Sequence, residues 1–312
     1  MLKLFQKLKN KAVCLTLILL TDYDRGAPST DDGRRSGLLQ LPSSSRYDMD
    51  DIQARVESGL VQSLTRGLSL LEVLSEREHG LRLKDLARET KLSPSTAHRL
   101  LTTLEQKRFV RFDRDSCVWS IGSNCFTTGS GFLRQQQFMT EATGRLRFLS
   151  NEIKETISLG VIDGGKMLVL KQVSGRQVAA SLLTPGTRSS PHISALGKML
   201  LASRQHQQQR SVVLSGQLDR MTDRTIVNPT ALARELEITE SRGFAVDDEE
   251  YVAGRRCIAA PIHDELGQCV AAISVCGMKS EIGDSQLPQL AAIIGRAALD
   301  ITRASGGYSP RR

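Results

Sequence analysis

Short polar and basic side chains are concentrated between residues 91 and 103, and on a helix most of them would share one face. The set comprises Lys91, Ser93, Ser95, Thr96, His98, Arg99 and Thr102. Short hydroxyl side chains let a helix approach the base edges of a DNA major groove, and Arg99 can pair with a guanine or a phosphate. The segment therefore predicts contacts with duplex DNA. On these residues alone, an ordinary solvated helical hairpin is an equally good interpretation.

Two short helices joined by a tight turn would hold these side chains in place. Apolar residues recur at helical spacing within 83–87 and, after a turn at 90–92, within 97–104. Ser93 is a good N-cap, and Pro94 suits the first position of the second helix. A supporting helix before the pair is predicted by a stripe of leucines, namely Leu64, Leu68, Leu71 and Leu74. This pattern is typical of a helix-turn-helix.

A basic β-hairpin is predicted directly after the second helix. Residues 109–112 alternate like a strand, 113–116 read as a turn, and 117–121 read as the returning strand. Between residues 91 and 114, Lys and Arg outnumber Asp and Glu by four. Such a hairpin is the wing of a winged helix, and Arg111 on it is a candidate phosphate contact. The wing favours DNA binding over the solvated hairpin.

The C-terminal half predicts an α+β domain in which helices flank one antiparallel sheet. Two hairpins are indicated, one around the turn at 163–165 and one around the turn at 264–267. Helices are predicted over 138–153, 229–242 and 287–303. Pro229 begins the second of these helices, and Gly243 ends it.

Enzymatic activity is not indicated. The histidines form no His-Glu-x-x-His pair, and neither a Gly-x-Ser-x-Gly elbow nor a Walker loop occurs. Cys257 with His192 or His263 could be imagined as a thiol hydrolase pair, but a cysteine on a strand is usually a small buried apolar residue. The six cysteines form no Cys-x-x-Cys pair, so we expect free thiols rather than disulfides, and neither a metal site nor a cofactor.

Composition favours an anionic partner. The net charge is +8 and the isoelectric point is near 9.3, while aromatic residues make up only 4%, too few for a protein that stacks single-stranded bases. No apolar stretch reaches the ~20 residues of a membrane span. We therefore expect a cytoplasmic protein without a membrane partner.

The two ends of the chain differ in composition from the rest. Residues 1–58 are expected to be a disordered extension, and Met49 is a candidate for the natural start. The short apolar run at 12–20 superficially resembles a secretory signal but lacks a small-residue cleavage site. Residues 306–312 are expected to form a disordered tail.

Several motifs, in this order, resemble the IclR (isocitrate lyase regulator) family of bacterial transcription factors. They are VQSLTRGL at 61–68, STAHRLL at 95–101, ALGKMLLA at 195–202, GFAVDDEE at 243–250, GRRCIAAPI at 254–262 and AAISV at 271–275. The resemblance spans about residues 60–304. It implies a winged helix-turn-helix over 59–123, a linker helix over 124–137, and a GAF-like or profilin-like domain over 138–305 for effector binding and oligomerisation.

The resemblance also implies a binding site for a small organic acid. The family's effector positions fall on Ala195 and Leu196, through their backbone amides, and on Asp247, Cys257, Ser274 and Cys276. Independently of the family, the N–H groups of residues 195–197 at a helix start suit a carboxylate, and Ser274 and Cys276 share a strand face. The alternative without a ligand is that Ser274 and Cys276 pack in the core at a strand end and that Asp247 only caps a turn. Cys276 replaces a hydroxyl that would better bind a keto-acid, and Leu196 is bulkier than alanine.

Two functions follow as hypotheses. The first is a ligand-responsive transcriptional regulator, expected to be a repressor rather than an activator, that controls a catabolic operon as a homodimer or homotetramer. The second is an architectural DNA-binding protein whose C-terminal domain only oligomerises. A ligand-induced change in melting temperature would separate them.

Overall fold

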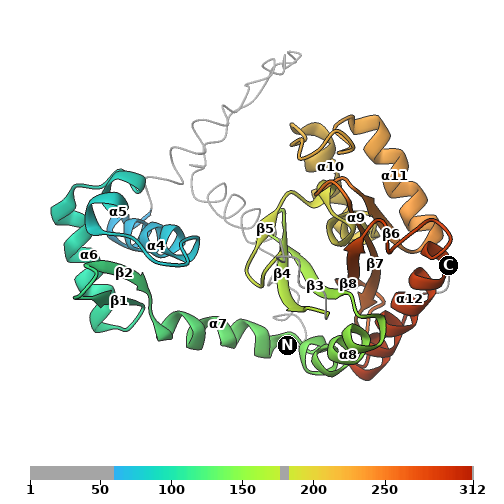
Figure 1. Ribbon diagram of the computed structural model, residues 1–312, viewed down its shortest axis with the longest axis horizontal. Coiled ribbons are helices and arrows are strands. Elements are labelled where there is room, and N and C mark those ends of the chain that lie inside the picture. The colour runs from blue at the N-terminus through green and yellow to red at the C-terminus, as the bar shows by residue number, and fades with distance from the viewer. Residues whose placement is uncertain (1–59, 176–182, 311–312) are drawn as a thin grey trace, which may run out of the picture. The chain divides into compact units, whose positions relative to one another are not determined.

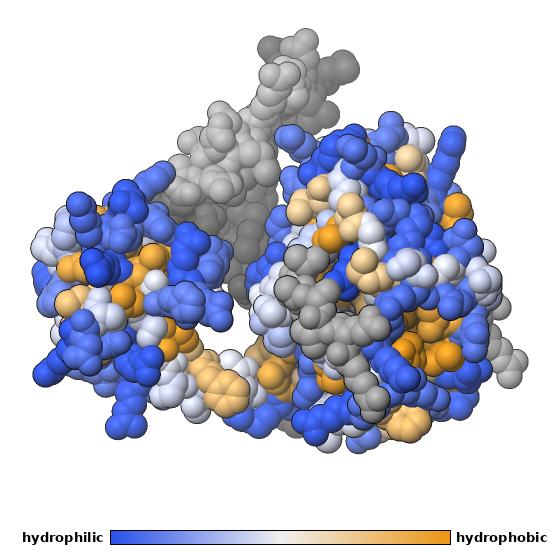
Figure 2. Space-filling model, in the orientation of Figure 1, coloured by the Kyte–Doolittle hydropathy of each residue, from blue (hydrophilic) through white to orange (hydrophobic). Residues whose placement is uncertain are grey.

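The computed structural model describes residues 60–175 and 183–310 (Figure 1). The expected N-terminal extension and its alternative start lie outside the described residues. Among the described residues, no helix combines the length and the apolar composition that a membrane crossing needs. Hydrophilic side chains cover most of the face seen in Figure 2, and apolar patches on it are small.

The N-terminal part is a winged helix-turn-helix, as predicted. It comprises α4 (Gln62–Ser75), α5 (Leu83–Glu89), α6 (Pro94–Gln106), β1 (Val110–Asp113) and β2 (Val118–Ile121). The two strands pair antiparallel, with Phe112 opposite Trp119. Its core contains Leu70, Leu86, Leu101 and Trp119, each at most 4% exposed. The helices and the wing therefore share one small core.

The start of α6 has the predicted cap. The Ser93 hydroxyl accepts a hydrogen bond from the Thr96 backbone N–H at 3.2 Å, and Pro94 occupies the first turn. Lys91, in the turn before it, has a left-handed φ of 55°. These local interactions fix where the second helix begins and which side chains it exposes.

The predicted leucine stripe of α4 is only half right. Of the four predicted leucines, Leu74 is buried and Leu71 is partly buried, whereas Leu64 and Leu68 are 62% and 50% exposed. Leu70, which was not part of the predicted stripe, is buried as well. The buried face passes through Gly67 instead. Leu64 and Leu68 therefore lie on an apolar face that this part of the chain does not cover.

The helix α7 (Ser123–Gln135) follows the wing, and α8 (Phe138–Ile153) begins the C-terminal domain. The domain contains one antiparallel sheet whose strands lie in the order β5-β4-β3-β8-β7-β6. The strands are β3 (Thr156–Asp163), β4 (Lys166–Val173), β5 (Arg188–Ser189), β6 (Ala245–Asp248), β7 (Arg255–His263) and β8 (Cys269–Met278). Both predicted hairpins are present, and the α+β class is correct.

Helices cover both faces of this sheet. On one face, α8 and α12 (Leu287–Ala304) pack on residues such as Ile157, Ile258 and Ile273. On the other face, α9 (Ala195–Leu201) packs on Met167 and Ala259. The second layer is completed by η2 (Pro191–Ile193), η3 (Arg204–His206), α10 (Gln207–Ser215) and α11 (Pro229–Arg242).

Two features of the domain depend on close backbone contacts. Gly197 lies so near η2 that an added Cβ would be 2.1 Å from the Pro191 carbonyl oxygen, which only glycine avoids. At the C-terminus, the Tyr308 N–H donates to the Asp264 carbonyl oxygen. The first part of the tail at 306–312, which was expected to be disordered, is therefore held against the β7–β8 turn.

Candidate functional site

A row of four side chains crosses the C-terminal sheet, one from each of β6, β7, β8 and β3. Asp247 is paired with Cys257, Cys257 with Cys276, and Cys276 with Thr156. Directly paired residues point to the same face of a sheet. These four residues, here called the cysteine row, therefore lie side by side on the face that carries α9, although they are widely separated in the sequence.

A second row runs parallel to the first, two residues further along the strands. It consists of Ala259, Ser274, Ser158 and Gln172, each paired with the next. The Gln172 side-chain amide donates to the Ser158 hydroxyl at 3.3 Å. This serine row brings two hydroxyls and one amide to the same face as the cysteine row.

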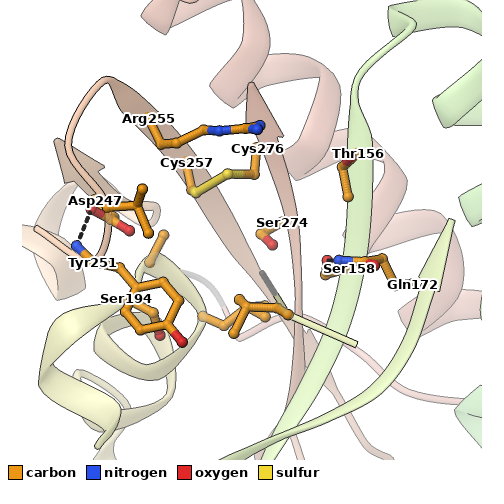
Figure 3. Close-up of a pocket in the computed structure, with 14 residues that line it drawn as sticks. Thr156, Ser158, Gln172, Ser194, Asp247, Tyr251, Arg255, Cys257, Ser274 and Cys276 are labelled. Atoms are coloured by element: carbon orange, nitrogen blue, oxygen red, sulfur yellow. Dashed lines mark hydrogen bonds between the residues drawn. A yellow bond between two sulfur atoms is a disulfide. The ribbon is translucent and has the colours of Figure 1, made fainter. Parts of the chain in front are cut away.

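Both rows contribute to the floor of a pocket whose opposite side is the start of α9 (Figure 3). All six residues that the sequence assigned to an effector line it, namely Ala195, Leu196, Asp247, Cys257, Ser274 and Cys276. Their binding role stays a prediction. Neither His192 nor His263 is among the lining residues, so the imagined thiol hydrolase pair has no place in this pocket.

The helix start differs in one respect from the expectation of unpaired N–H groups. The Gly197 N–H donates to the Ser194 hydroxyl at 3.1 Å, because Ser194 is the N-cap of α9. Ser194 itself lines the pocket. Of the three expected amides, those of Ala195 and Leu196 stay candidates for contact with a ligand.

Asp247 both caps a turn and lines the pocket. One carboxylate oxygen accepts hydrogen bonds from the backbone N–H groups of Glu250, at 2.8 Å, and Tyr251, at 3.3 Å. The residue is 3% exposed, and burial, followed by the nearby negative charge of Glu250, raises the pKa of Asp247 to about 7. Near neutral pH the carboxyl group is therefore balanced between its neutral and its charged form.

Lys198 connects α9 to the same turn. Its side chain is fully buried, and its Nζ lies 2.5 Å from Glu250 Oε1 and 3.7 Å from Glu235 Oε1. Burial raises the pKa of Glu250, while the charge of Lys198 acts in the opposite direction. The ion pair holds the turn that Asp247 caps against the helix that forms the other side of the pocket.

The expectation that all cysteines are free thiols is wrong for one pair. Cys257 and Cys276 form a disulfide across neighbouring strands, with 4.1 Å between their Cα atoms (Figure 3). Their separation of 19 residues offers no spacing motif, so only the strand register shows that they meet. In the disulfide form neither sulfur can donate the hydrogen bond to an effector that the family resemblance implies.

Sequence reasoning missed several polar residues of the pocket, and Arg255 is the most consequential. Arg255 lies two residues before Cys257 on β7 and is the only Lys or Arg among the described lining residues. Burial and Glu281 raise the pKa of Glu155 to about 7, and the charge of Arg255 acts against that rise. The basic residue inside the GRRCIAAPI motif at 254–262 was a signal that could have found it. The other missed polar residues are Thr156, Ser158, Gln172, Ser194 and Tyr251.

The DNA-contact candidates mostly lie on exposed positions of the winged helix. Lys91, Ser95, His98 and Arg99 are exposed in the turn and on α6, and Arg111 is exposed on β1. Several of the hydroxyl-bearing candidates have local hydrogen bonds at the start of α6 or within it, and the Ser95 hydroxyl shares one of 3.1 Å with that of Ser93. Ser93 caps it, Thr96 shares a 2.8 Å hydrogen bond with Ser93, and the Thr102 hydroxyl donates to the His98 carbonyl oxygen.

A winged helix-turn-helix followed by an α+β domain with a polar pocket defines the class of two-domain transcriptional regulators. Two family profiles match the chain, "IclR helix-turn-helix domain" at residues 63–114 and "Bacterial transcriptional regulator IclR C-terminal" at residues 131–303. The chain belongs to the IclR family, as the sequence motifs predicted.

Known proteins agree with this assignment. The chain is 36% identical over 252 residues to the transcriptional repressor IclR of Escherichia coli, covering 80% of this chain and 92% of that one. It is 34% identical over 256 residues to the transcriptional regulator BhcR of Paracoccus denitrificans, covering 82% and 90%. A solved structure of an IclR homologue from Microbacterium hydrocarbonoxydans, in complex with 4-hydroxybenzoate, matches with a TM-score of 0.70 at 25% identity, covering 78% of this chain and 98% of that one.

Proposed function

We propose that this protein is a repressor that binds operator DNA through its winged helix and responds to a small organic acid bound in the C-terminal pocket. The observation that carries the proposal is the meeting of six effector positions and Arg255 at one pocket. The similar repressors of known function support the sign of regulation, and by analogy the target is a catabolic operon.

The chemistry of the pocket fits a carboxylate with a compact apolar body. Arg255 supplies a positive charge, and the hydroxyls of Ser158 and Ser274 supply hydrogen bonds. Leu183 and Leu196 supply apolar contacts. The structure of the homologue with 4-hydroxybenzoate supports the same ligand class, since that molecule is a carboxylate on a small ring.

DNA recognition is assigned to the exposed face of α6 and to the wing. Ser95, His98 and Arg99 would face the major groove, and Lys91 and Arg111 would contact phosphates. Because one winged helix buries little DNA surface, we expect a dimer that reads two half-sites. The exposed Leu64 and Leu68 of α4 are candidate dimer contacts, and the C-terminal domains would pair dimers into tetramers.

The domain boundaries proposed from the sequence are retained. They are 59–123 for DNA binding, 124–137 for the linker and 138–305 for effector binding and oligomerisation. A repressor of this kind acts on chromosomal DNA, so we place it in the cytoplasm, and we assign it no catalytic activity.

A thermal-shift screen of small monocarboxylates on the full-length protein tests the proposal. At a concentration 100 times its Kd, a ligand adds about 2.7 kcal/mol of stability, which raises the melting temperature by several degrees. Leu196→Trp fills the pocket and should abolish the shift. Val212→Trp, at a position on α10 that is 66% exposed, is the matched control and should respond like the wild type.

The screen also distinguishes the repressor from the alternative function, an architectural DNA-binding protein. If no acid shifts the melting temperature while the protein still binds DNA, the C-terminal domain only oligomerises, and the architectural hypothesis takes the place of the repressor.

A further inference from the structure

We propose that Cys257 and Cys276 form a reversible thiol–disulfide site, oxidised by hydroperoxides and reduced by small-molecule thiols, that changes the affinity of the pocket for its carboxylate ligand. The second half of this proposal rests on the proposed function, and the first half does not.

The strand register brings the two cysteines together independently of any ligand. They are directly paired residues of β7 and β8, 4.1 Å apart at Cα, and they point to the same face. A disulfide can therefore form without a change of strand pairing. The neighbouring strands, β3 beside β8 and β6 beside β7, are expected to hold the pair in position whether or not the bond is present.

The pair is also accessible to small reagents, because both cysteines are partly exposed and line the pocket. Cys269, on the same strand as Cys276, is the contrasting case. Its burial raises the pKa of its thiol to about 12, and it is free. Arg255, on the same face of β7 as Cys257, supplies a positive charge that favours a nearby thiolate over a thiol.

The chemistry balances with one named oxidant and one named reductant. The thiolate of one cysteine attacks a hydroperoxide and becomes a sulfenic acid, and the O–O bond breaks to release an alcohol or water. The second thiol then displaces water from the sulfenic sulfur and forms the S–S bond. Two equivalents of a thiol such as glutathione return both cysteines to thiols and become a disulfide themselves. Disulfides in a reducing cytoplasm are usually transient and often redox-sensing, which fits this role.

Oxidation changes what the floor of the pocket offers to a ligand. In the reduced form, two S–H groups lie between Asp247 and Thr156 in the cysteine row and can donate weak hydrogen bonds. In the disulfide form, both donors are lost and β7 is covalently joined to β8. We expect the oxidised protein to bind a carboxylate roughly three- to tenfold more weakly, the size of effect typical of one lost hydrogen bond.

Peptide mapping of the full-length protein tests the site itself. Trypsin should release residues 257–279 as one peptide, because Arg256 precedes it and Lys279 ends it, and this peptide contains Cys257, Cys269 and Cys276. After hydrogen peroxide, denaturation and alkylation, the peptide should carry one alkyl group, on Cys269. After glutathione it should carry three. Three alkyl groups in both samples would overturn the proposal.

A binding measurement then tests the effect on the pocket. The acid with the largest shift in the screen, with 4-hydroxybenzoate as the first probe, is titrated against oxidised and reduced protein. Cys276→Ser cannot form the bond and should bind equally well with or without peroxide. Cys117→Ser keeps the pair and should remain sensitive to peroxide. Equal affinity of oxidised and reduced wild type would overturn the effect on the ligand.

The two proposals fail in distinguishable ways. If no acid binds in either redox state while the peptide shows a reversible disulfide, the effector function is wrong and the redox site stands without its effect on a ligand. If an acid binds but Cys257 and Cys276 always alkylate, the redox site is wrong and the effector function stands.

Discussion

Lys198 on α9 and Glu250 in the turn after β6 form a buried ion pair, with Nζ 2.5 Å from Oε1. The lysine side chain is fully buried and that of the glutamate is 7% exposed. The pair therefore joins the two sides of the ligand pocket at a point that water barely reaches.

Replacing Lys198 by methionine should destabilise the protein strongly. The change leaves Glu250 buried without its cation, beside the carboxyl group of Asp247, and breaking a buried pair in this way typically costs about 3–5 kcal/mol. Urea unfolding followed by circular dichroism measures the loss. Lys84→Met, at an exposed position on α5, is the control. A loss of similar size in both variants would contradict the role given to the ion pair.

The contribution of Asp247 to the free energy of unfolding should fall as the pH rises from about 4 to about 7. In the folded protein the pKa of Asp247 is about 7, against an ordinary 3.8, so the folded state binds the extra proton within this window. The stabilisation is complete below 3.8 and is lost as the pH passes 7. Its slope is on the order of 1 kcal/mol per pH unit at most.

Asp247→Asn should make this pH dependence shallower, as measured by urea unfolding at pH 5 and pH 8. The amide oxygen can still accept the two backbone hydrogen bonds of the turn. Some dependence remains, because the pKa values of Glu155 and Glu250 are also raised. A variant with the full wild-type slope would show that Asp247 is not the titrating group.

Arg255→Gln should weaken binding of a carboxylate ligand by roughly 1.5–3 kcal/mol, the range for hydrogen bonds to charged groups. Isothermal titration measures the change. Ser274→Ala removes a neutral hydroxyl and should cost only about 1 kcal/mol. If the serine variant loses more affinity than the arginine variant, the carboxylate binds elsewhere in the pocket.

Arg99→Ala on α6 should weaken operator binding by about 1–3 kcal/mol if Arg99 makes a bidentate contact with a base. Arg111→Ala on the wing should weaken binding to all sequences alike and reduce the salt dependence. Gel-shift titrations at several salt concentrations separate the two effects. Unchanged affinity in both variants would remove α6 and the wing from the DNA interface.

The double substitution of Leu64 and Leu68 by glutamate should reduce self-association, because both side chains are exposed on one apolar face of α4. Light scattering at micromolar concentration measures the change in mass. The helix should keep its structure, since Leu70 and Leu74 supply its buried contacts. An unchanged mass would place the dimer contacts on other elements.

Sequence reasoning succeeded where the signal is local. Ser93 with Pro94 marks the start of α6, and Pro229 with Gly243 marks both ends of α11, because caps and turns depend on a few adjacent residues. The leucine stripe of α4 was half wrong because an apolar period cannot tell a buried core face from an exposed apolar face.

The pocket could be predicted only in part, because its floor is built by strand register. Ser274 and Cys276 share a face by their spacing, which a sequence shows directly. The pairing of Cys257 with Cys276, and the arrival of Thr156 beside them, depend on which strands are neighbours. That order follows from the packing of the whole sheet, so neither the disulfide nor the full set of lining residues was visible beforehand.

In the cysteine row and the serine row, strand geometry sets the spacing between side chains on the pocket floor. Neighbouring strands of a sheet lie ~4.8 Å apart on average, and residues two positions apart on a strand are ~6.8 Å apart. Cys257 and Cys276 are closer, with 4.1 Å between their Cα atoms. The four members of the cysteine row therefore span ~14 Å, the distance a molecule lying along the row would need to cover to contact all four. A change of ligand needs only a different side chain at one of these positions, since the backbone stays where it is. On the proposed function, one scaffold can thus diverge to recognise many acids, one substitution at a time.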